Sequence, residues 1–377
     1  MKILHTADLH IGKRINGFSM LEEQKFILNK IVSECKRNDV DAIVLAGDIY
    51  DKIVPSAEAV TLFDEFLVNL SKLNKQIFII SGNHDSAERL AFASRLLDEC
   101  GVHVAPVYSG KVSPIVISDE FGEVAVYLLP FIKPQIVQHF AGDNVKISTY
   151  EDAVRYVIDK MEIDNKRRNI LVTHQFITGA ESTDSEDVMV GGLDNIDAAV
   201  FKVFDYVALG HLHRPQCCGR ETVRYSGSPL KYSFSEVKDN KSLSLITMAE
   251  DKVDVKEIEL SPMHDWNDLR GTYEELADKS FYDGKTYQED YVRITLTNED
   301  DIPDGMRKLQ TIYHRLMELR YDNKRTRQGM VNISVASRTA EKQPQELVEE
   351  LFEKQNGRKL SEEQSEYLNE LIKSIWN

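Results

Sequence analysis

The chain has 377 residues, of which 42% are hydrophobic and 29% are charged, and its formal net charge is −16 at pH 7. This composition is ordinary for a globular protein, and the length favours one large domain with one or two smaller ones. No stretch approaches the roughly 18 to 20 apolar residues of a membrane span. The negative charge argues against broad, charge-driven binding of nucleic acid, although metal ions or a basic partner could supply a positive field.

The cysteines and the first residues bear on where the protein works. The four cysteines show no C-x-x-C spacing, and Cys217 and Cys218 are adjacent, so a reducing environment is expected. Residues 1–10 (MKILHTADLH) have neither the apolar core of a signal peptide nor an Arg/Ser-rich transit pattern. We therefore expect a cytoplasmic protein that does not associate with a membrane.

Short apolar strands alternate with amphipathic helices along the first two thirds of the chain. Continuous apolar runs predict buried strands, and apolar residues three or four positions apart predict helices. In chain order the expected elements are a strand at 3–8, a helix at 27–35, a strand at 41–45, a helix at 60–70, strands at 77–80 and 124–129, a helix at 150–161, strands at 169–173 and 206–209, and successive strands from 222 to 260. This order predicts an α/β sandwich that finishes in antiparallel strands.

The last third of the chain predicts smaller units. Residues 266–340 suggest a small α+β domain, with a strand at 291–296, a helix near 304–317 and another strand at 331–336. Residues 341–377 predict two amphipathic helices, the second beginning with a capping-box pattern at 361–364. Such a pair cannot bury both apolar stripes alone, so it either packs back onto the body or docks another protein.

Polar side chains follow five of the predicted strands, at the points where the apolar runs stop. In open α/β sheets the carboxyl ends of strands are where sites form, and core packing gives no reason to place polar groups at all five. Each group alone is a weak signal, but together and in this order they predict a functional site. The residues are Asp8, His10, Asp48, Asn83, His84, Asp85, His174, His211 and His213.

The mixture of carboxylate, amide and imidazole groups suits two divalent metal ions side by side, with one carboxylate bridging them. Oxygen ligands favour manganese or magnesium, imidazoles add iron or zinc, and without thiolates a structural zinc site is not expected. Two such ions can bind a phosphate, activate a water and stabilise the leaving oxygen, which indicates phosphoester hydrolysis. We expect Asn83 to be a neutral ligand and His84 to protonate the leaving oxygen. Asp85 either orients His84 or is a solvent-facing turn residue.

The series D-x-H, G-D-x-x-D, G-N-H-D, H and G-H-x-H resembles the signature of the calcineurin-like metallophosphoesterases. The resemblance implies a four-layer αββα sandwich and a binuclear metal centre, with His84 as the catalytic histidine. The ligands that it implies for one metal are Asp8, His10, Asp48 and His213. The ligands that it implies for the other are Asp48, Asn83, His174 and His211, so that Asp48 bridges.

Longer stretches are similar to the SbcD family of bacterial double-strand-break nucleases: HTADLHIGK (5–13), GDIYDKIVPS (47–56), SGNHDSAERL (81–90), YVALGHLHRPQ (206–216) and YSGSPLKYSFSE (225–236). This resemblance implies manganese-dependent 3′ to 5′ exonuclease action on double-stranded DNA ends and hairpins, and single-strand endonuclease action, with Mg²⁺ or Fe²⁺ as alternative metals. It also implies a homodimer bound to two chains of the ATPase SbcC, associated with the nucleoid. The implied domains are a nuclease domain at 1–265, an α+β capping or DNA-binding domain at 266–340 and a helix pair at 341–377 that docks SbcC.

Two further questions stay open in the sequence. Candidate DNA contacts are Lys13, Arg14, Lys324, Arg325 and Arg327, but a run of basic charge is usually a solvated face. The other interpretations of the chain are a phosphoesterase acting on small phosphodiesters or phosphomonoesters, and a scaffold whose metal site is vestigial. Activity on linear DNA separates the small-substrate enzyme from the nuclease, and metal content separates the scaffold from both.

Overall fold

The computed structural model describes residues 1–142, 144–186, 195–250 and 252–324, and beyond them the single residues 326, 349, 352, 360, 361, 364, 365, 367 and 368. The chain divides into two compact units. The first comprises 1–269, 282–293 and 310–318, and the second comprises 270–281, 294–309 and 319–377. Among the described residues, no helix is long and apolar enough to cross a membrane.

Two six-stranded sheets form the centre of the first unit. The first sheet, in the order β14-β13-β1-β4-β5-β6, contains β1 (Lys2–Thr6), β4 (Ala42–Ala46), β5 (Gln76–Ile80), β6 (Val102–Val104), β13 (Ser242–Met248) and β14 (Val253–Glu259). The second, in the order β11-β12-β10-β9-β8-β7, contains β7 (Ile115–Asp119), β8 (Gly122–Leu129), β9 (Arg168–His174), β10 (Tyr206–Gly210), β11 (Gln216–Cys218) and β12 (Arg220–Tyr225). The central strands of each sheet are parallel, whereas β13 and β14 pair antiparallel at one edge.

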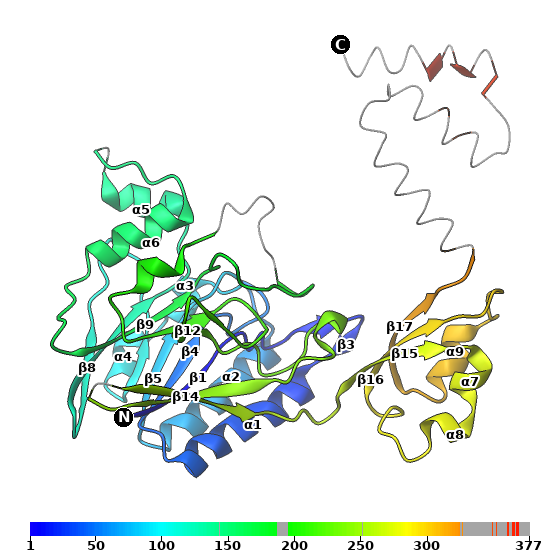
Figure 1. Ribbon diagram of the computed structural model, residues 1–377, viewed down its shortest axis with the longest axis horizontal. Helices are drawn as coiled ribbons and strands as arrows, with labels where there is room; N and C mark the ends of the chain where they lie inside the picture. The colour runs from blue at the N-terminus through cyan, green and yellow to red at the C-terminus, as the bar shows by residue number, and fades with distance from the viewer. Residues whose placement is uncertain are drawn as a thin grey trace. The chain divides into compact units, whose positions relative to one another are not determined.

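Helices cover the outer faces of the two sheets, as Figure 1 shows. The helices α1 (Leu21–Asn38) and α2 (Ala57–Ser71) lie on one side of the strands, and α5 (Pro134–Ala141) and α6 (Tyr150–Asp159) lie on the other. The predicted four-layer αββα sandwich is therefore confirmed. Shorter elements of the same unit are β2 (Arg14–Ile15), β3 (Phe18–Ser19), α3 (Ala87–Leu90), α4 (Ser94–Asp98) and the 3₁₀ turns η1 (Ala198–Phe201) and η2 (Phe234–Glu236).

The alternation of side chains along each strand explains the layers, because successive residues of a strand point to opposite faces. On β4, Ile43 and Leu45 belong to the core that packs against α1 and α2. Val44, between them, belongs to the core between the two sheets, together with Phe78 of β5 and Val172 of β9. A strand that is buried on both faces has a continuous run of apolar residues in the sequence, and this is why the sequence predicts these strands well.

A three-stranded sheet in the order β15-β16-β17 follows, and here the sequence prediction was partly wrong. Its elements and the nearby helices are β15 (Trp266–Gly271), α7 (Tyr273–Ala277), α8 (Lys279–Tyr282), β16 (Tyr291–Leu296), α9 (Gly305–Gln310) and β17 (Arg315–Tyr321). The helix expected at 304–317 ends at Gln310; a turn follows at 311–314, and β17 begins at Arg315. Leu309, Tyr313 and Leu316 are all buried, and their spacing of three to four residues fits a helix as well as it fits this turn and strand.

Two other predictions concern the C-terminal part of the chain. The strand expected at 331–336 lies outside the described residues, and so does almost all of the helix pair expected at 341–377. The reciprocal capping bonds predicted there are present: the Ser361 N–H donates to Gln364 Oε1 (3.0 Å), and the Gln364 N–H donates to Ser361 Oγ (3.3 Å). The domain boundaries at 265 and 340 stay predictions.

An ion pair at the end of the second sheet generates a prediction about acid stability. Arg168 donates from Nη1 to Asp119 Oδ2 (3.0 Å) and so holds the pKa of the Asp119 carboxyl well below its ordinary value. A group whose pKa is lower in the folded than in the unfolded protein stabilises the fold above its unfolded pKa, and this contribution is lost as the pH falls. We expect Asp119→Asn to lower the free energy of unfolding at neutral pH, and the deficit to shrink below about pH 4.

The measurement is urea unfolding of wild type and Asp119→Asn across that pH range, with metal chelated in all samples. Glu120→Gln, at the exposed neighbouring position, is the matched control and should change stability little at any pH. A deficit in Asp119→Asn that stays constant down to about pH 3 would contradict the ion-pair explanation.

Candidate metal centre

Five strands carry the predicted ligands to one edge of the sandwich. β1, β4 and β5 are parallel neighbours in the first sheet, and β9 and β10 are parallel neighbours in the second. From the first sheet come Asp8 and His10 after β1, Asp48 after β4 and Asn83 after β5; from the second come His174 at the end of β9, and His211 and His213 after β10. The structure brings all seven of these residues together.

Four of the seven have a backbone that non-glycine residues rarely adopt. The φ angles of Asp8, His10, Asp48 and His211 are 55°, 44°, 49° and 107°. The loops also hold each other through the backbone: the Asp8 N–H donates to Gly47 O (3.0 Å), and the His10 N–H donates to Asp48 O (2.9 Å). Strained backbone of this kind clusters at functional sites, where the surrounding structure over-determines it. Its concentration at the predicted ligands supports a built site.

Asp8, His10 and His213 form one group whose ligand atoms lie within 4.8 Å of one another. The Nε2 atoms of His10 and His213 are 3.0 Å apart, and His10 Nε2 is 3.7 Å from Asp48 Oδ2. Within the described residues, Nδ1 of His10 is buried without a hydrogen-bond partner. Buried imidazoles that face each other beside carboxylates have the donor chemistry of a divalent cation site.

Asn83, His174 and His211 form the other side of the centre. Asn83 Oδ1 lies 3.0 Å from His174 Nε2 and 3.0 Å from His211 Nδ1, and His174 Nε2 is 3.4 Å from Asp48 Oδ2. The Nδ1–H of His174 donates to Ala46 O (2.8 Å), so that the lone pair of its neutral ring is on Nε2, facing the amide oxygen. Lone pairs that converge in this way fit a bound cation.

The electrostatics of the centre fit a cation as well. Burial raises the pKa of the Asp8 carboxyl to about 7. Burial raises the pKa of the Asp48 carboxyl, but the charge and the hydrogen bond of His174 together with nearby histidines lower it by more, so the pKa lies below its ordinary range. Burial lowers the pKa of His174, but Asp48 outweighs this effect and the pKa rises to about 9. Without a metal ion, protons therefore supply the positive charge that these two carboxylates require.

His84 lies at the rim of the centre, with 21% of its side chain exposed. Its backbone N–H donates to Asp48 Oδ1 (2.9 Å), its Nδ1 lies 3.2 Å from Asp51 O, and its Nε2 lies 4.0 Å from Asp48 Oδ2. An Nδ1–H that donates to the carbonyl leaves Nε2 directed at the centre. The structure thus places His84 beside the ligands without burying it among them.

Asp85 binds the backbone of two loops. Its carboxylate accepts from the N–H groups of Ile49 (3.0 Å), Tyr50 (2.9 Å) and Gly82 (3.0 Å). This arrangement does not match the alternative of a solvent-facing turn residue. Asp85 fixes the loop that carries His84 against the loop that carries Asp48, and direct orientation of the His84 ring by Asp85 stays a prediction.

The structure separates the candidate DNA contacts. Lys13 is close to the centre and donates to Asp51 Oδ1 (2.8 Å), whose carboxylate is also 3.9 Å from His10 Nδ1. Arg14 is exposed and donates to Gly17 O (2.6 Å), and Lys324 is exposed. The candidates Arg325 and Arg327 lie outside the described residues.

Sequence reasoning missed the residues that surround His213. Ser185, Glu236 and Lys241 form hydrogen bonds around it, and the Tyr232 ring packs on it with a centroid distance of 5.7 Å. One signal was present, since Tyr232 and Glu236 lie in the stretch 225–236 that resembles the SbcD family but carries no predicted ligand. Ser185 and Lys241 carry no comparable signal.

Comparisons with known proteins identify the family of the chain. Residues 1–215 match the family model of the calcineurin-like phosphoesterases, and residues 260–356 match the model described as the type 5 capsule protein repressor C-terminal domain, SbcD_C. The chain is 32% identical over 383 residues to the SbcD subunit of the nuclease SbcCD from Staphylococcus epidermidis (strain ATCC 12228 / FDA PCI 1200), covering 100% of this chain and 99% of that one. A solved dimetal phosphatase from Danio rerio is 12% identical with a TM-score of 0.40, covering 68% of this chain and 95% of that chain.

The match to the family model over residues 1–215, together with the fold, shows that the chain belongs to the calcineurin-like phosphoesterases. It is a metal-dependent phosphodiesterase. Within that class, the similarity over its full length and the matched C-terminal domain place it in the SbcD family of nucleases.

The close approach of two loops generates a prediction about Gly82. A Cβ atom at this position would lie 2.1 Å from Asp48 Oδ1 and 2.5 Å from Asp48 N, which is far inside van der Waals contact. We expect Gly82→Ala to displace Asp48 and to weaken Mn²⁺ binding by about 10-fold or more, comparable to the loss of a residue that supports a metal ligand. Equilibrium dialysis against Mn²⁺ measures this change.

Gly284→Ala is the control for backbone strain alone. Gly284 has a φ of +72°, and no described atom would lie within 4 Å of an added Cβ. This variant should cost about 1 kcal/mol of stability or somewhat more and leave Mn²⁺ affinity unchanged. Equal Mn²⁺ affinity in wild type and in folded Gly82→Ala would show that the close approach of residue 82 to Asp48 is not needed for Mn²⁺ binding.

Proposed function

We propose that this protein is the manganese-dependent nuclease component of a DNA end-processing complex. It would act as a 3′ to 5′ exonuclease on double-stranded ends and hairpins and as an endonuclease on single strands, in DNA repair and recombination. The observation that carries the proposal is the pair of ligand groups that share Asp48, with His84 at their rim. The similarity over the full length to a protein named as the SbcD subunit of the nuclease SbcCD supports the substrate class.

The proposed ligands divide between two ions. One ion is held by Asp8, His10, Asp48 and His213, and the other by Asp48, Asn83, His174 and His211. The mixed oxygen and nitrogen set supports Mn²⁺ as the native ion, with Mg²⁺ or Fe²⁺ as alternatives. Two ions held by these residues would supply positive charge for binding a phosphodiester and for activating a water.

The protein's own residues orient the substrate and move a proton. As an imidazolium whose Nδ1–H donates to the Asp51 carbonyl, His84 would give its Nε2 proton to the leaving oxygen and become neutral. Asp85 would keep His84 in place through the loop backbone. Lys13, which is paired with Asp51, is available to contact the phosphate backbone near the cleaved bond. We also propose that DNA is contacted by the other basic candidates, Arg14, Lys324, Arg325 and Arg327.

The proposed partners follow from the charge and the domain order. A chain with a net charge of −16 does not hold DNA by charge alone, so a partner with basic surface is expected to deliver it. The proposed partner is the ATPase SbcC, with two chains of each protein in the complex, docked by the helix pair at 341–377. The nuclease domain at 1–265 and the capping or DNA-binding domain at 266–340 complete the arrangement, which would act at the nucleoid in the cytoplasm.

The first test of this function uses His84→Ala and an end-labelled linear duplex with Mn²⁺. We expect wild type to shorten the duplex, and His84→Ala to do so about 10²- to 10⁴-fold more slowly, because a general acid contributes that much to the rate. Mn²⁺ binding should be retained in the variant, since His84 is not among the proposed ligands. His139→Ala, at an exposed histidine on α5, is the matched control and should cleave like wild type.

The same assay includes a small chromogenic phosphodiester. The nuclease proposal would be contradicted if the protein hydrolyses this ester but leaves the duplex intact, even after SbcC and ATP are added. That result would favour a phosphodiesterase of small substrates. A wild-type protein that binds no Mn²⁺ would favour a scaffold with a vestigial site.

The homodimer is proposed to form through the segment of α3 and α4. Phe92 and Leu96 lie four residues apart there and are 82% and 71% exposed, the highest exposed fractions among the large apolar side chains that the structure describes. A two-fold contact between identical copies of this segment would cover both. The proposed occupant of this surface is therefore a second copy of the chain.

We expect the double variant Phe92→Glu/Leu96→Glu to be monomeric in sedimentation velocity, where wild type is a dimer, because like charges would face each other across the two-fold axis. Val203→Glu, at another exposed apolar side chain, is the control and should stay dimeric. Hydrolysis of the small ester checks that the monomer is folded. A dimer that persists in the double variant would place the interface elsewhere.

A further inference from the structure

A buried ion pair lies directly behind His213. Glu236 is 0% exposed and Lys241 is 3% exposed, and Glu236 Oε2 accepts from Lys241 Nζ at 2.5 Å. A buried pair is tolerated only when its remaining hydrogen-bonding capacity is met. Here it is met, because Glu236 Oε1 also accepts from Ser185 Oγ (2.6 Å) and Ser233 Oγ (3.0 Å).

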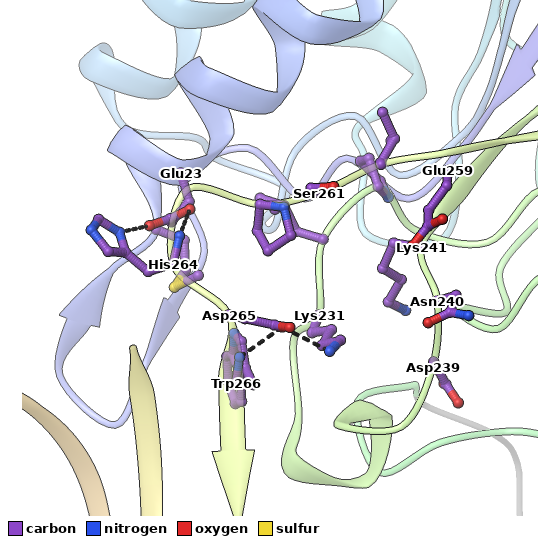
Figure 2. A pocket seen from close by; sticks show the side chains of 15 residues that line it. Glu23, Lys231, Asp239, Asn240, Lys241, Glu259, Ser261, His264, Asp265 and Trp266 are labelled. Carbon is purple, nitrogen blue, oxygen red and sulfur yellow. Dashed lines mark hydrogen bonds and ion pairs between the residues drawn. The ribbon is translucent and has the colours of Figure 1, made fainter. Parts of the chain in front are cut away.

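Lys241 connects this pair to the backbone of the metal ligand. Its Nζ donates to His213 O (2.8 Å) and to Ser228 Oγ (3.1 Å), so all three of its N–H donors have partners. Lys241 and Lys231 also line a small pocket of about 100 Å³, shown in Figure 2. Lys231 donates to Val237 O (2.9 Å), which fixes the turn immediately after Glu236.

A hydroxyl relay connects Glu236 to the ring of His213. Ser185 Oγ lies 2.7 Å from His213 Nδ1 and donates to Glu236 Oε1. A carboxylate has no proton to give, so the hydroxyl proton points to Glu236 and the hydroxyl oxygen accepts the Nδ1–H of His213. The lone pair of His213 is therefore on Nε2, the atom that lies 3.0 Å from His10 Nε2.

The two sides of the centre are supported differently. On the Asn83 side, the tautomer of His174 is set by a backbone carbonyl, Ala46 O. On the His213 side, it is set by charged and hydroxyl side chains from separate segments. The Tyr232 ring packs on both His10 (5.5 Å) and His213 (5.7 Å), and a Cβ at Gly227 would lie 2.7 Å from His213 O. Gly227, Tyr232, Glu236 and Lys241 thus all contact the His10 and His213 side of the centre, whereas Tyr225, which precedes them, donates to Gln175 O on the other side.

We propose that Glu236, held by Lys241, is a positioning residue for His213 and thereby controls occupancy of one of the two metal sites. The site that depends on Glu236 is formed by Asp8, His10, Asp48 and His213. The site that includes Asn83, His174 and His211 does not depend on it. This assignment gives a role to the stretch YSGSPLKYSFSE, and it rests on the binuclear centre of the proposed function.

The test is the number and affinity of Mn²⁺ ions bound by the full chain, measured by equilibrium dialysis and by electron paramagnetic resonance. In Glu236→Gln we expect one of two ions to bind about 10- to 100-fold more weakly, as is typical when the partner of a metal-binding histidine is removed, and the other to bind as in wild type. The spectrum at sub-saturating Mn²⁺ should then change from that of a coupled pair of ions to that of a single ion.

Three further variants separate positioning from folding. Glu236→Gln/Lys241→Met avoids an unpaired buried lysine and should show the same loss at one site. Ser185→Ala removes only the relay hydroxyl and should weaken the same ion, by less. Asp119→Asn breaks an ion pair of the same sandwich that has no contact with the centre, and it should bind both ions with wild-type affinity despite lower stability.

The outcomes are distinct. Folded Glu236→Gln and Ser185→Ala proteins that bind both ions with wild-type affinity would overturn the inference, and so would an equal loss at both sites. If Glu236→Gln fails to fold, Ser185→Ala and the double variant decide by the same criterion. A wild-type protein that binds fewer than two ions would instead overturn the binuclear centre of the proposed function.

Discussion

Two carboxylates buried side by side are the constraint on which the rest of this structure depends. Asp8 and Asp48 are removed from water, and a buried charge is stable only when it is paired or binds a metal. Without a cation, the pKa of Asp8 rises to about 7 through burial, and Asp48 keeps its charge only beside His174. Both residues have positive φ angles, so the backbone is strained where it places their carboxylates in the centre. A fold that accepts these costs has a built-in requirement for positive charge at this point.

The sandwich architecture makes this convergence achievable. Ligands come from the ends of β1, β4 and β5 in one sheet and from β9 and β10 in the other, so neither sheet carries a complete centre. The core between the sheets, with Ile3, Phe78 and Val172, keeps the two edges together. At the edge itself there is no room for side chains between the loops: a Cβ at Gly210 would lie 1.9 Å from Ala46 O. Packing far from the site therefore fixes the distances within it.

The sequence predicts the parts of this structure that are local, and it fails where contacts are long-range. Apolar runs followed at once by Asp, Asn or His reveal both the strands and the seven ligand candidates. The backbone contacts of Asp85 join loops more than thirty residues apart, and no local pattern reports them. Glu236 and Ser185 are 51 residues apart, so their relay to His213 is equally hidden. The end of the predicted helix at 304–317, where β17 begins instead, has the same cause, because pairing with β16 decides between two patterns that the apolar spacing fits equally well.

Exposure across the centre indicates how a phosphodiester would enter it. The ionisable ligand candidates are almost completely buried, whereas His84 is partly exposed at the rim. A substrate that approaches from solvent therefore meets a neutral or positive group before it meets the carboxylates, and their negative charge is screened by whatever cations they bind. The same arrangement reconciles a chain of net charge −16 with an anionic substrate. Attraction for phosphate would then be confined to the few ångströms around the centre, because the net negative charge of the chain gives DNA no reason to stay elsewhere.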